Sequence, residues 1–208
     1  IKYNNKSNSG YLNGIREAIE EKNIHVQNFN FFIISNVDLK LSKNFFTLLN
    51  SISVDKHTGW LAPKIFSHKE RKDRNPKILK RPSKYKMYLY YFMYRIPLIY
   101  HFNTNLIYRF SRRSKQNNNS RIIYAGHGSF IILTQNFTKF FPIIKFESFL
   151  FGEEIFIAEL CKIRNLEVKY FPKIRIDDFD HSSTSKLKKS DFFKMNRDSL
   201  KYIISKFY

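Results

Sequence analysis

The chain alternates between segments whose apolar residues recur at helical spacing and short runs that are apolar throughout. The helical spacing predicts helices over residues 12–22, 41–52, 154–164 and 191–208. The apolar runs predict strands over residues 29–35, 60–63, 122–125, 130–133, 168–171 and 174–176. We expect proline to stop the strand at 60–63 and to separate the last two strands. This alternation predicts an α/β fold with a mainly parallel sheet flanked by helices.

The middle of the chain differs from this pattern. Residues 64–83 are polar and basic and contain two prolines, so we expect a loop there, and Ser42 is a candidate N-cap for the helix at 41–52. Residues 85–110 are dense in aromatic side chains, with Pro97 as an interruption. At 208 residues the chain can bury one substantial core, so we expect a single domain over 1–208 with a basic aromatic insertion at 64–121.

The charge is unevenly distributed. The formal net charge is +20, and residues 64–121 hold 16 Lys and Arg against two acids, whereas residues 147–180 hold eight of the 17 acids. We expect the basic segment to contact polyanions and the acidic one to carry metal or acid–base chemistry. The single cysteine, Cys161, excludes an internal disulfide and a cysteine-only zinc site, and it fits a reducing compartment. Its apolar surroundings favour a buried, inert thiol.

Three acidic positions are candidates for chemistry. Asp38 follows the buried strand at 29–35, where an open α/β sheet binds ligands and where a cation could meet a diphosphate. Glu153 and Glu154 open a helix, and one of them could act as a general base, since neighbouring carboxylates raise each other's pKa. Each has a plain structural alternative as a cap or a first-turn acid. The run at 177–184 reads equally well as a metal-ligand loop or as a solvated turn.

The order of several blocks is more informative than any one of them. Asn8-Ser9-Gly10-Tyr11 precedes a helix, Asn36-Val37-Asp38 ends a strand, and Gly126-His127-Gly128-Ser129 lies between two strands; then come residues 149–154 (FLFGEE), Tyr170-Phe171-Pro172 and the His/Ser/Thr loop at 181–184. This succession resembles the GT-A fold inverting glycosyltransferases of the family 2 type, closest to the rhamnosyltransferase-like members that build bacterial surface polysaccharides.

The resemblance implies a role for each block. Asp38 matches the last acid of an Asp-x-Asp-type motif that holds Mg²⁺ or Mn²⁺ against the donor's diphosphate, and Asn36 stands at its first position. Glu154 matches the catalytic base, with Glu153 beside it. The resemblance further implies that Asn8 and Gly10 lie on the donor side with Asn36, and that Gly126, His127 and Gly128 line the acceptor side.

The sequence departs from the family pattern at two places. The family's histidine after the strand at 174–176 is replaced by Asp178 in the preferred register, with His181 three residues later, so both stay open as the third metal-site residue. The first strand–helix units of the GT-A-like, Rossmann-type sheet have no counterpart before Ile1. We therefore expect a chain truncated at its N-terminus, and an inactive transferase fragment is one alternative.

The basic aromatic middle allows several partners. Residues 87–100 are too short to span a bilayer, which needs ~20 apolar residues, but tyrosines flanked by Lys and Arg are typical of a peripheral membrane contact. With a nucleotide-sugar donor and a glycan or lipid-linked acceptor, the implied location is the cytoplasm, at the inner face of the cell membrane. A buried aromatic helix beside a solvated loop fits nearly as well. A nucleic-acid-binding module ranks lower, because the acidic clusters have no role in it.

Overall fold

The computed structural model describes residues 8–96, 119–179 and 187–208. Its helices are α1 (Tyr11–Glu21), the 3₁₀ turn η1 (Val26–Asn28), α2 (Phe45–Asn50), α3 (Lys84–Arg95), α5 (Gln135–Thr138), α6 (Glu153–Ile163) and α7 (Lys189–Phe207). Its strands are β1 (Phe31–Ser35), β2 (Leu39–Leu41), β3 (Thr58–Ser67), β4 (Lys72–Asp73), β5 (Arg121–Ile123), β6 (Phe130–Thr134) and β7 (Glu167–Asp178).

The seven strands form one mixed sheet in the order β1-β6-β3-β7-β2, with β4 added beside β3 and β5 beside β7. Within the described ranges only β3 and β7 run parallel, and the other strand pairs are antiparallel. The α/β prediction is therefore confirmed, but the expectation of a mainly parallel sheet is wrong. Parallel neighbours need a crossover of a dozen or more residues, and the chain between the end of β3 at Ser67 and the start of β7 at Glu167 supplies one.

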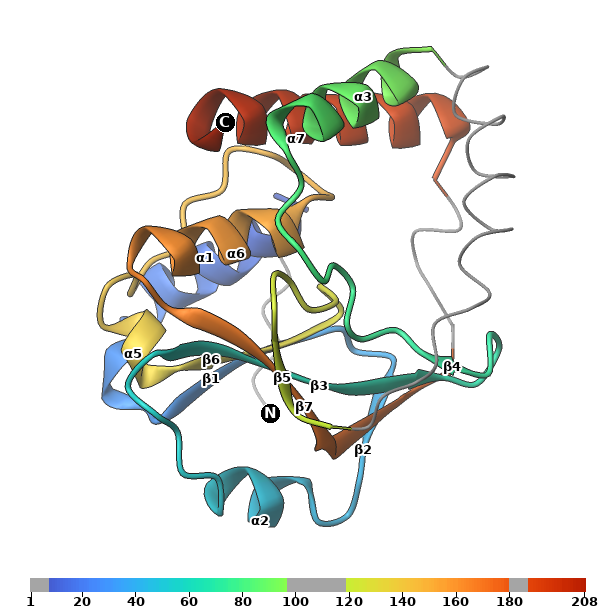
Figure 1. Ribbon diagram of the computed structural model, residues 1–208. Helices are drawn as coiled ribbons and strands as arrows, with labels where there is room; N and C mark the ends of the chain where they lie inside the picture. The colour runs from blue at the N-terminus through green and yellow to red at the C-terminus, as the bar shows by residue number, and fades with distance from the viewer. Residues whose placement is uncertain (1–7, 97–118, 180–186) are drawn as a thin grey trace.

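The helices lie on both faces of the sheet (Figure 1). Helices α1 and α6 cover one face, with α3 and α7 lying side by side beyond them, and α2 covers the other face. Two apolar clusters match these layers, one built around α6 and Trp60 and one around Phe45 of α2. The sheet is thus buried on both sides at β6 and β3, whose residues 130–134 and 58–63 are all buried.

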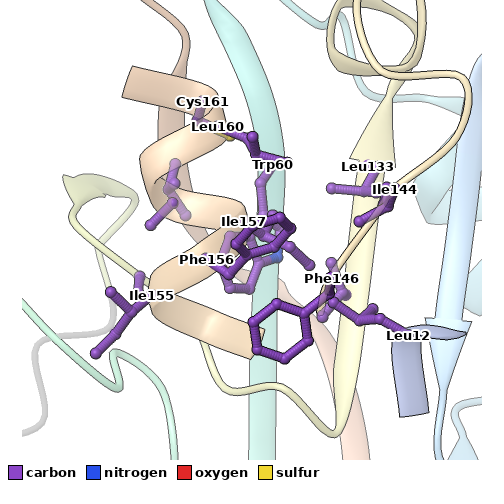
Figure 2. Packing of buried hydrophobic residues seen from close by; sticks show 14 of the residues in the cluster. Leu12, Trp60, Leu133, Ile144, Phe146, Ile155, Phe156, Ile157, Leu160 and Cys161 are labelled. Carbon is purple, nitrogen blue, oxygen red and sulfur yellow. The ribbon is translucent and has the colours of Figure 1, made fainter. Parts of the chain in front are cut away.

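Helix α6 packs directly on the central strand. Figure 2 shows Phe156 and Ile157 of α6 lying against Trp60 of β3, with Phe146 and Leu12 in the same cluster. Trp60 is fully buried, and the Phe146 and Phe156 rings are 4.7 Å apart. Burying large side chains such as these contributes roughly 1.5–3 kcal/mol each. Helix α6 is therefore fixed on the sheet, and so is the position of its first turn. The Cys161 thiol is also buried there and free, as the sequence predicted.

Proline does not end β3, contrary to the sequence prediction. The strand continues through Pro63 to Ser67, and its register with β7 shifts between Pro63 and Lys64. Side chains from the following segment supply the missing hydrogen bonds. The Asn75 amide donates to the Pro63 carbonyl at 2.7 Å, and the Ile65 backbone N–H donates to the Asp73 carboxylate at 3.0 Å. These bonds stabilise an irregularity that proline would otherwise turn into a strand end.

The residues predicted as two strands around Pro172 form one strand, β7. Its irregular stretch lies opposite that of β3, because Pro63 pairs with Phe171 while Lys64 pairs with Arg175. Tyr170 links the two irregularities by donating its hydroxyl to the Asp73 carboxylate at 2.6 Å. Burial raises the pKa of Asp73, which accepts hydrogen bonds from both strand neighbours. The Asp73 carboxylate therefore joins β3 and β7 where both would otherwise separate.

One helix boundary differs from the sequence prediction, and one helix lies in a segment for which no helix start was predicted. Helix α2 begins at Phe45 after Asn44, not at Ser42, because Leu41 belongs to β2, which pairs with β7. Helix α3 begins at Lys84, where Ser83 caps it by accepting the Lys86 backbone N–H. The remainder of the predicted aromatic segment, residues 97–118, lies outside the described ranges. None of the described helices combines the length and the apolarity that crossing a bilayer requires.

We predict that Asn75→Ala lowers the free energy of unfolding by about 2–4 kcal/mol, because it leaves the buried Pro63 carbonyl and the His127 backbone N–H without their partner. Urea unfolding followed by the fluorescence of the single tryptophan, Trp60, measures this loss. Asn50→Ala, at an exposed position in α2, is the matched control and should change stability little. Equal losses in the two variants would contradict the assigned role of Asn75.

Candidate functional site

Asp38 lies in a tight turn that leaves the sheet at the carboxyl end of β1. Residues 36–38 carry the chain from β1 to β2, and Leu39 then pairs with Asp178 at the end of β7. The Asn36 backbone N–H donates to the Ser129 carbonyl at 2.8 Å, which ties the turn to the start of β6. Asn36 is exposed and Asp38 half-buried. Asp38 and Asp178 therefore both lie at the edge of the sheet where the carboxyl ends of β1 and β7 are found.

The loop that leads into β6 is fixed from two sides. Gly126 packs so closely on Trp60 and Ala62 that a Cβ atom there would lie 2.7 Å from the Ala62 side chain. The His127 backbone N–H donates to the Asn75 side-chain carbonyl at 2.7 Å. Gly126 thus serves core packing in the structure, and the loop residues that follow it, His127 and Gly128, are the ones that reach the site.

His127 is held in a neutral form. Burial, together with the positive charges of Lys77 and Arg74, lowers its pKa to about 3. Its Nδ1 accepts the Ser129 backbone N–H at 3.2 Å and lies 2.9 Å from the Ser129 hydroxyl. Because Nδ1 accepts, the ring proton is on Nε2, which makes His127 a hydrogen-bond donor and not a base at neutral pH.

The start of α1 contacts the same loop. Gly10 adopts φ 98°, and a Cβ atom there would meet the Phe149 carbonyl at 2.1 Å, so only glycine fits. Asn8 accepts the Gly10 backbone N–H through its side chain at 3.1 Å. These two predicted donor-side residues thus shape the turn into α1. The turn places Tyr11, whose hydroxyl donates to the Gly128 carbonyl at 3.1 Å.

The two glutamates at the start of α6 have different environments. Glu153 is only 6% exposed and accepts the Phe151 backbone N–H at 2.9 Å, whereas Glu154 is half-buried. Burial raises the pKa of Glu153 to about 8, and the charge of Glu154 contributes to the rise. Glu153 therefore holds a proton at neutral pH. Glu154 lies against Gly128, where a Cβ atom would be 3.4 Å from the Glu154 carboxyl carbon.

Tyr11 shows that the acids from separate segments share one site. Burial raises the pKa of the Tyr11 phenol, and so do the negative charges of Glu154, of Asp38 and, above its own pKa, of Glu153. All three carboxylates therefore lie near enough to act on one hydroxyl, although Asp38 is far from the glutamates in sequence. The fold thus places Asp38, Glu153 and Glu154 within electrostatic reach of one tyrosine in low-dielectric surroundings.

The third predicted metal-site residue, Asp178 or His181, differs from the prediction in its surroundings or lies outside the described ranges. Asp178 is buried at the end of β7, and its carboxylate forms an ion pair with Arg74 at 2.5 Å. The alternative residue, His181, lies outside the described ranges. Over residues 8–96, 119–179 and 187–208 there is no group of three or more His, Cys, Asp or Glu side chains that could hold a metal ion. Asp38 and Asp178 by themselves therefore form no complete metal cage.

Sequence reasoning missed two residues that the structure places in the site. Tyr11 belongs to the Asn8–Tyr11 block, but its contacts with Gly128 and the carboxylates depend on tertiary structure. Arg74 lies in the segment predicted to be a loop, and no sequence pattern indicates that it pairs with Asp178. The position of Tyr11 directly after a glycine at a helix start could have indicated a site residue. Arg74 could not be distinguished from the many other basic residues of its segment.

Comparison of the sequence with protein-family models gives no match, and comparison with curated proteins gives none.

We predict that Glu153→Gln flattens the pH dependence of stability. Folding raises the pKa of Glu153 from 4.5 to about 8, so the folded state binds more protons between these values. The stability of the unchanged protein should fall as pH rises toward 8, because the unfolded state then releases the proton more easily. Glutamine has no such proton, so the variant should be more stable at about pH 9, by an order of 2–4 kcal/mol, and similar near pH 5.

Urea unfolding at a series of pH values measures this difference. Glu147→Gln, at an exposed position just before α6, is the control and should keep the slope of the unchanged protein. If Glu153→Gln has that same slope, Glu153 is not the buried proton carrier.

Proposed function

We propose that this chain is an inverting glycosyltransferase that moves a sugar from a nucleotide-diphosphate donor to a glycan or lipid-linked acceptor in surface polysaccharide synthesis. The observation that carries the proposal is the meeting of three segments at residues 128–129: Glu154 and the Tyr11 hydroxyl lie against Gly128, and the turn that bears Asp38 hydrogen-bonds to Ser129. Asp38 follows a strand end and Glu154 opens a helix, so one acid can serve the donor and the other the acceptor. This arrangement supports the roles that the GT-A resemblance implies.

Glu154 is the base in this proposal. An inverting transfer requires a base that removes the proton of the acceptor hydroxyl as it attacks the sugar, from within about 2.6–3.2 Å. Glu154 suits this role because it is partly exposed and its carboxylate has no hydrogen bond or ion pair with any described residue. The absence of a side chain at Gly128 leaves space beside that carboxylate for an acceptor.

Glu153 and Tyr11 support the base without contacting the acceptor. Glu153 stays protonated at neutral pH, so it adds no second negative charge beside Glu154. The Tyr11 hydroxyl donates to the Gly128 carbonyl and ties this loop to the start of α1. A general base in this setting contributes roughly 100- to 10,000-fold to the rate.

Asp38 serves the donor diphosphate. Mg²⁺ or Mn²⁺ is bound in many sites by one or two carboxylates together with phosphate oxygens and water, so Asp38 fits without a complete protein cage. A bound cation would supply neutralisation of the charge that develops on the leaving diphosphate. Asp178 fits less well, because its charge is already balanced by Arg74. We assign Asp178 to holding Arg74 at this edge, where Lys77 adds positive charge near His127.

We predict that Asp38→Asn weakens binding of Mn²⁺-loaded nucleoside diphosphate about tenfold or more, because it removes the charged cation ligand. Calorimetric titration of the full-length protein with UDP, GDP and dTDP, each with and without Mn²⁺, measures the change. Asp198→Asn, in an exposed ion pair on α7, is the matched control and should bind as the unchanged protein does. Equal affinity of the Asp38 and Asp198 variants would refute the donor-side role of Asp38.

We predict that Glu154→Gln lowers turnover by roughly 100-fold or more while leaving binding of the donor unchanged, because the amide cannot accept the proton. Turnover is measured as nucleoside diphosphate released from UDP-, GDP- and dTDP-sugars, with and without monosaccharide acceptors. Glu147→Gln is the control for loss of a nearby charge. A Glu154 variant that keeps the turnover of the control would remove Glu154 from the mechanism.

A further inference from the structure

Helix α3 presents a stripe of exposed apolar side chains. Its members are 41–87% exposed; four lie on α3 at the spacing i, i+3, i+4 and i+7, and the fifth directly follows the helix: Tyr85, Tyr88, Leu89, Phe92 and Ile96. Residues at this spacing lie on one face of a helix. A surface helix normally turns polar side chains outward, so a continuous apolar stripe on the outer face points to a partner.

The opposite face of α3 is already used for packing. Met87 is fully buried, Met93 is 5% exposed, and Tyr94 packs edge-on against Phe192 of α7 at 5.9 Å between ring centres. Figure 1 shows α3 lying along α7 on the side of the molecule away from the sheet. The exposed stripe is therefore distinct from the face of α3 that packs into the core. It is a second apolar face of the same helix, on the side that faces solvent.

Positive charges flank the stripe on both sides. Successive helical residues turn by about 100°, which places Lys84 and Arg95 along one border of the stripe and Lys86 along the other. All three are exposed. Helix α3 contains no acidic residue, and no Asp or Glu occurs anywhere from Arg74 to Phe146. The surface thus combines an apolar centre, tyrosines and a cationic border with no carboxylate of its own.

We propose that the α3 stripe docks this chain on the surface of an anionic lipid bilayer. The helix lies in the plane of the interface, with Leu89 and Phe92 at the boundary between headgroups and acyl chains. Tyr85 and Tyr88 are amphipathic and suit the headgroup level, and the flanking Lys and Arg reach the lipid phosphates. Docking depends on α3 alone, so it stands whether or not the chain is a glycosyltransferase.

A second copy of this chain fits the stripe less well. Two α3 helices packed face to face would bring their cationic borders together, and neither helix carries a carboxylate to pair with them. Like charges placed in this way repel each other. An anionic surface instead meets every border residue with opposite charge. Charge complementarity therefore favours lipid.

The test is co-sedimentation of the full-length protein with vesicles. Phosphatidylcholine vesicles with about one-third phosphatidylserine are compared with pure phosphatidylcholine vesicles. We expect binding to the anionic vesicles and about tenfold or more weaker binding by the double variant Leu89→Asp/Phe92→Asp. The matched control is Phe46→Asp/Ile163→Asp, which places the same charges at exposed apolar positions on α2 and α6. It should bind as the unchanged protein does.

A second arm tests the charged border. Lys84→Ser/Lys86→Ser should weaken binding to the anionic vesicles and leave any residual binding to pure phosphatidylcholine unchanged. Circular dichroism checks that each variant is folded. Equal vesicle binding by the stripe variant and its control would overturn the proposal. So would an unchanged protein that ignores vesicles but forms dimers in sedimentation velocity runs that Leu89→Asp/Phe92→Asp abolishes.

Discussion

The hydrogen bonds that Asp73 and Asn75 make across the break at Pro63 hold the rest of the structure in place. Asp73 accepts from Ile65 and Tyr170, and Asn75 donates to Pro63 and accepts from His127. Without these bonds β3 would lose its ladder beyond Pro63, and β7 would lose its only parallel neighbour among the described strands. The far ends of β3 and β7 are where Asp178 pairs with Arg74. The same two side chains therefore position both the sheet edge and the 126–129 loop.

The buried carboxylates of the described chain are neutralised in two different ways. Asp178 is paired with Arg74, and Glu159 is paired with Arg81 at 2.7 Å and accepts the Tyr124 hydroxyl. Glu153 has no cationic partner among the described residues and is neutralised instead by its proton. A buried acid without a counter-charge is costly for stability, and such acids concentrate at functional sites. Glu153, the buried acid that lacks a counter-charge among the described residues, thus lies beside Glu154, the base of the proposed function.

The elements that depend on local apolar periodicity were predicted correctly from the sequence. The helices at α1, α6 and α7 were placed almost to the residue because each has a sustained apolar face. The continuation of β3 past Pro63 could not be predicted, since it depends on hydrogen bonds from Asp73 and Asn75, which the sequence presents only as part of a polar loop. The mixed sheet was missed for a related reason, because the pattern of strands and helices does not specify which strands become neighbours. Asp38 and Glu154 were predicted as site residues from the order of the motifs, whereas the contacts of Tyr11 arise only through tertiary structure.

The structure also divides the basic segment into two parts with different purposes. Arg74 and Arg81 are taken up by buried carboxylates, whereas Lys84, Lys86 and Arg95 remain on the outer surface of α3. Arg81 lies just before α3, and its guanidinium binds Glu159 through two nitrogens and lies 3.9 Å from the centre of the Tyr208 ring. Glu159 is one and a half turns along the same helix from Glu154. The proposed docking helix is thereby coupled to the helix that carries the proposed base. A bilayer bound at α3 would then lie at a set distance from Glu154, as transfer to a lipid-linked acceptor requires.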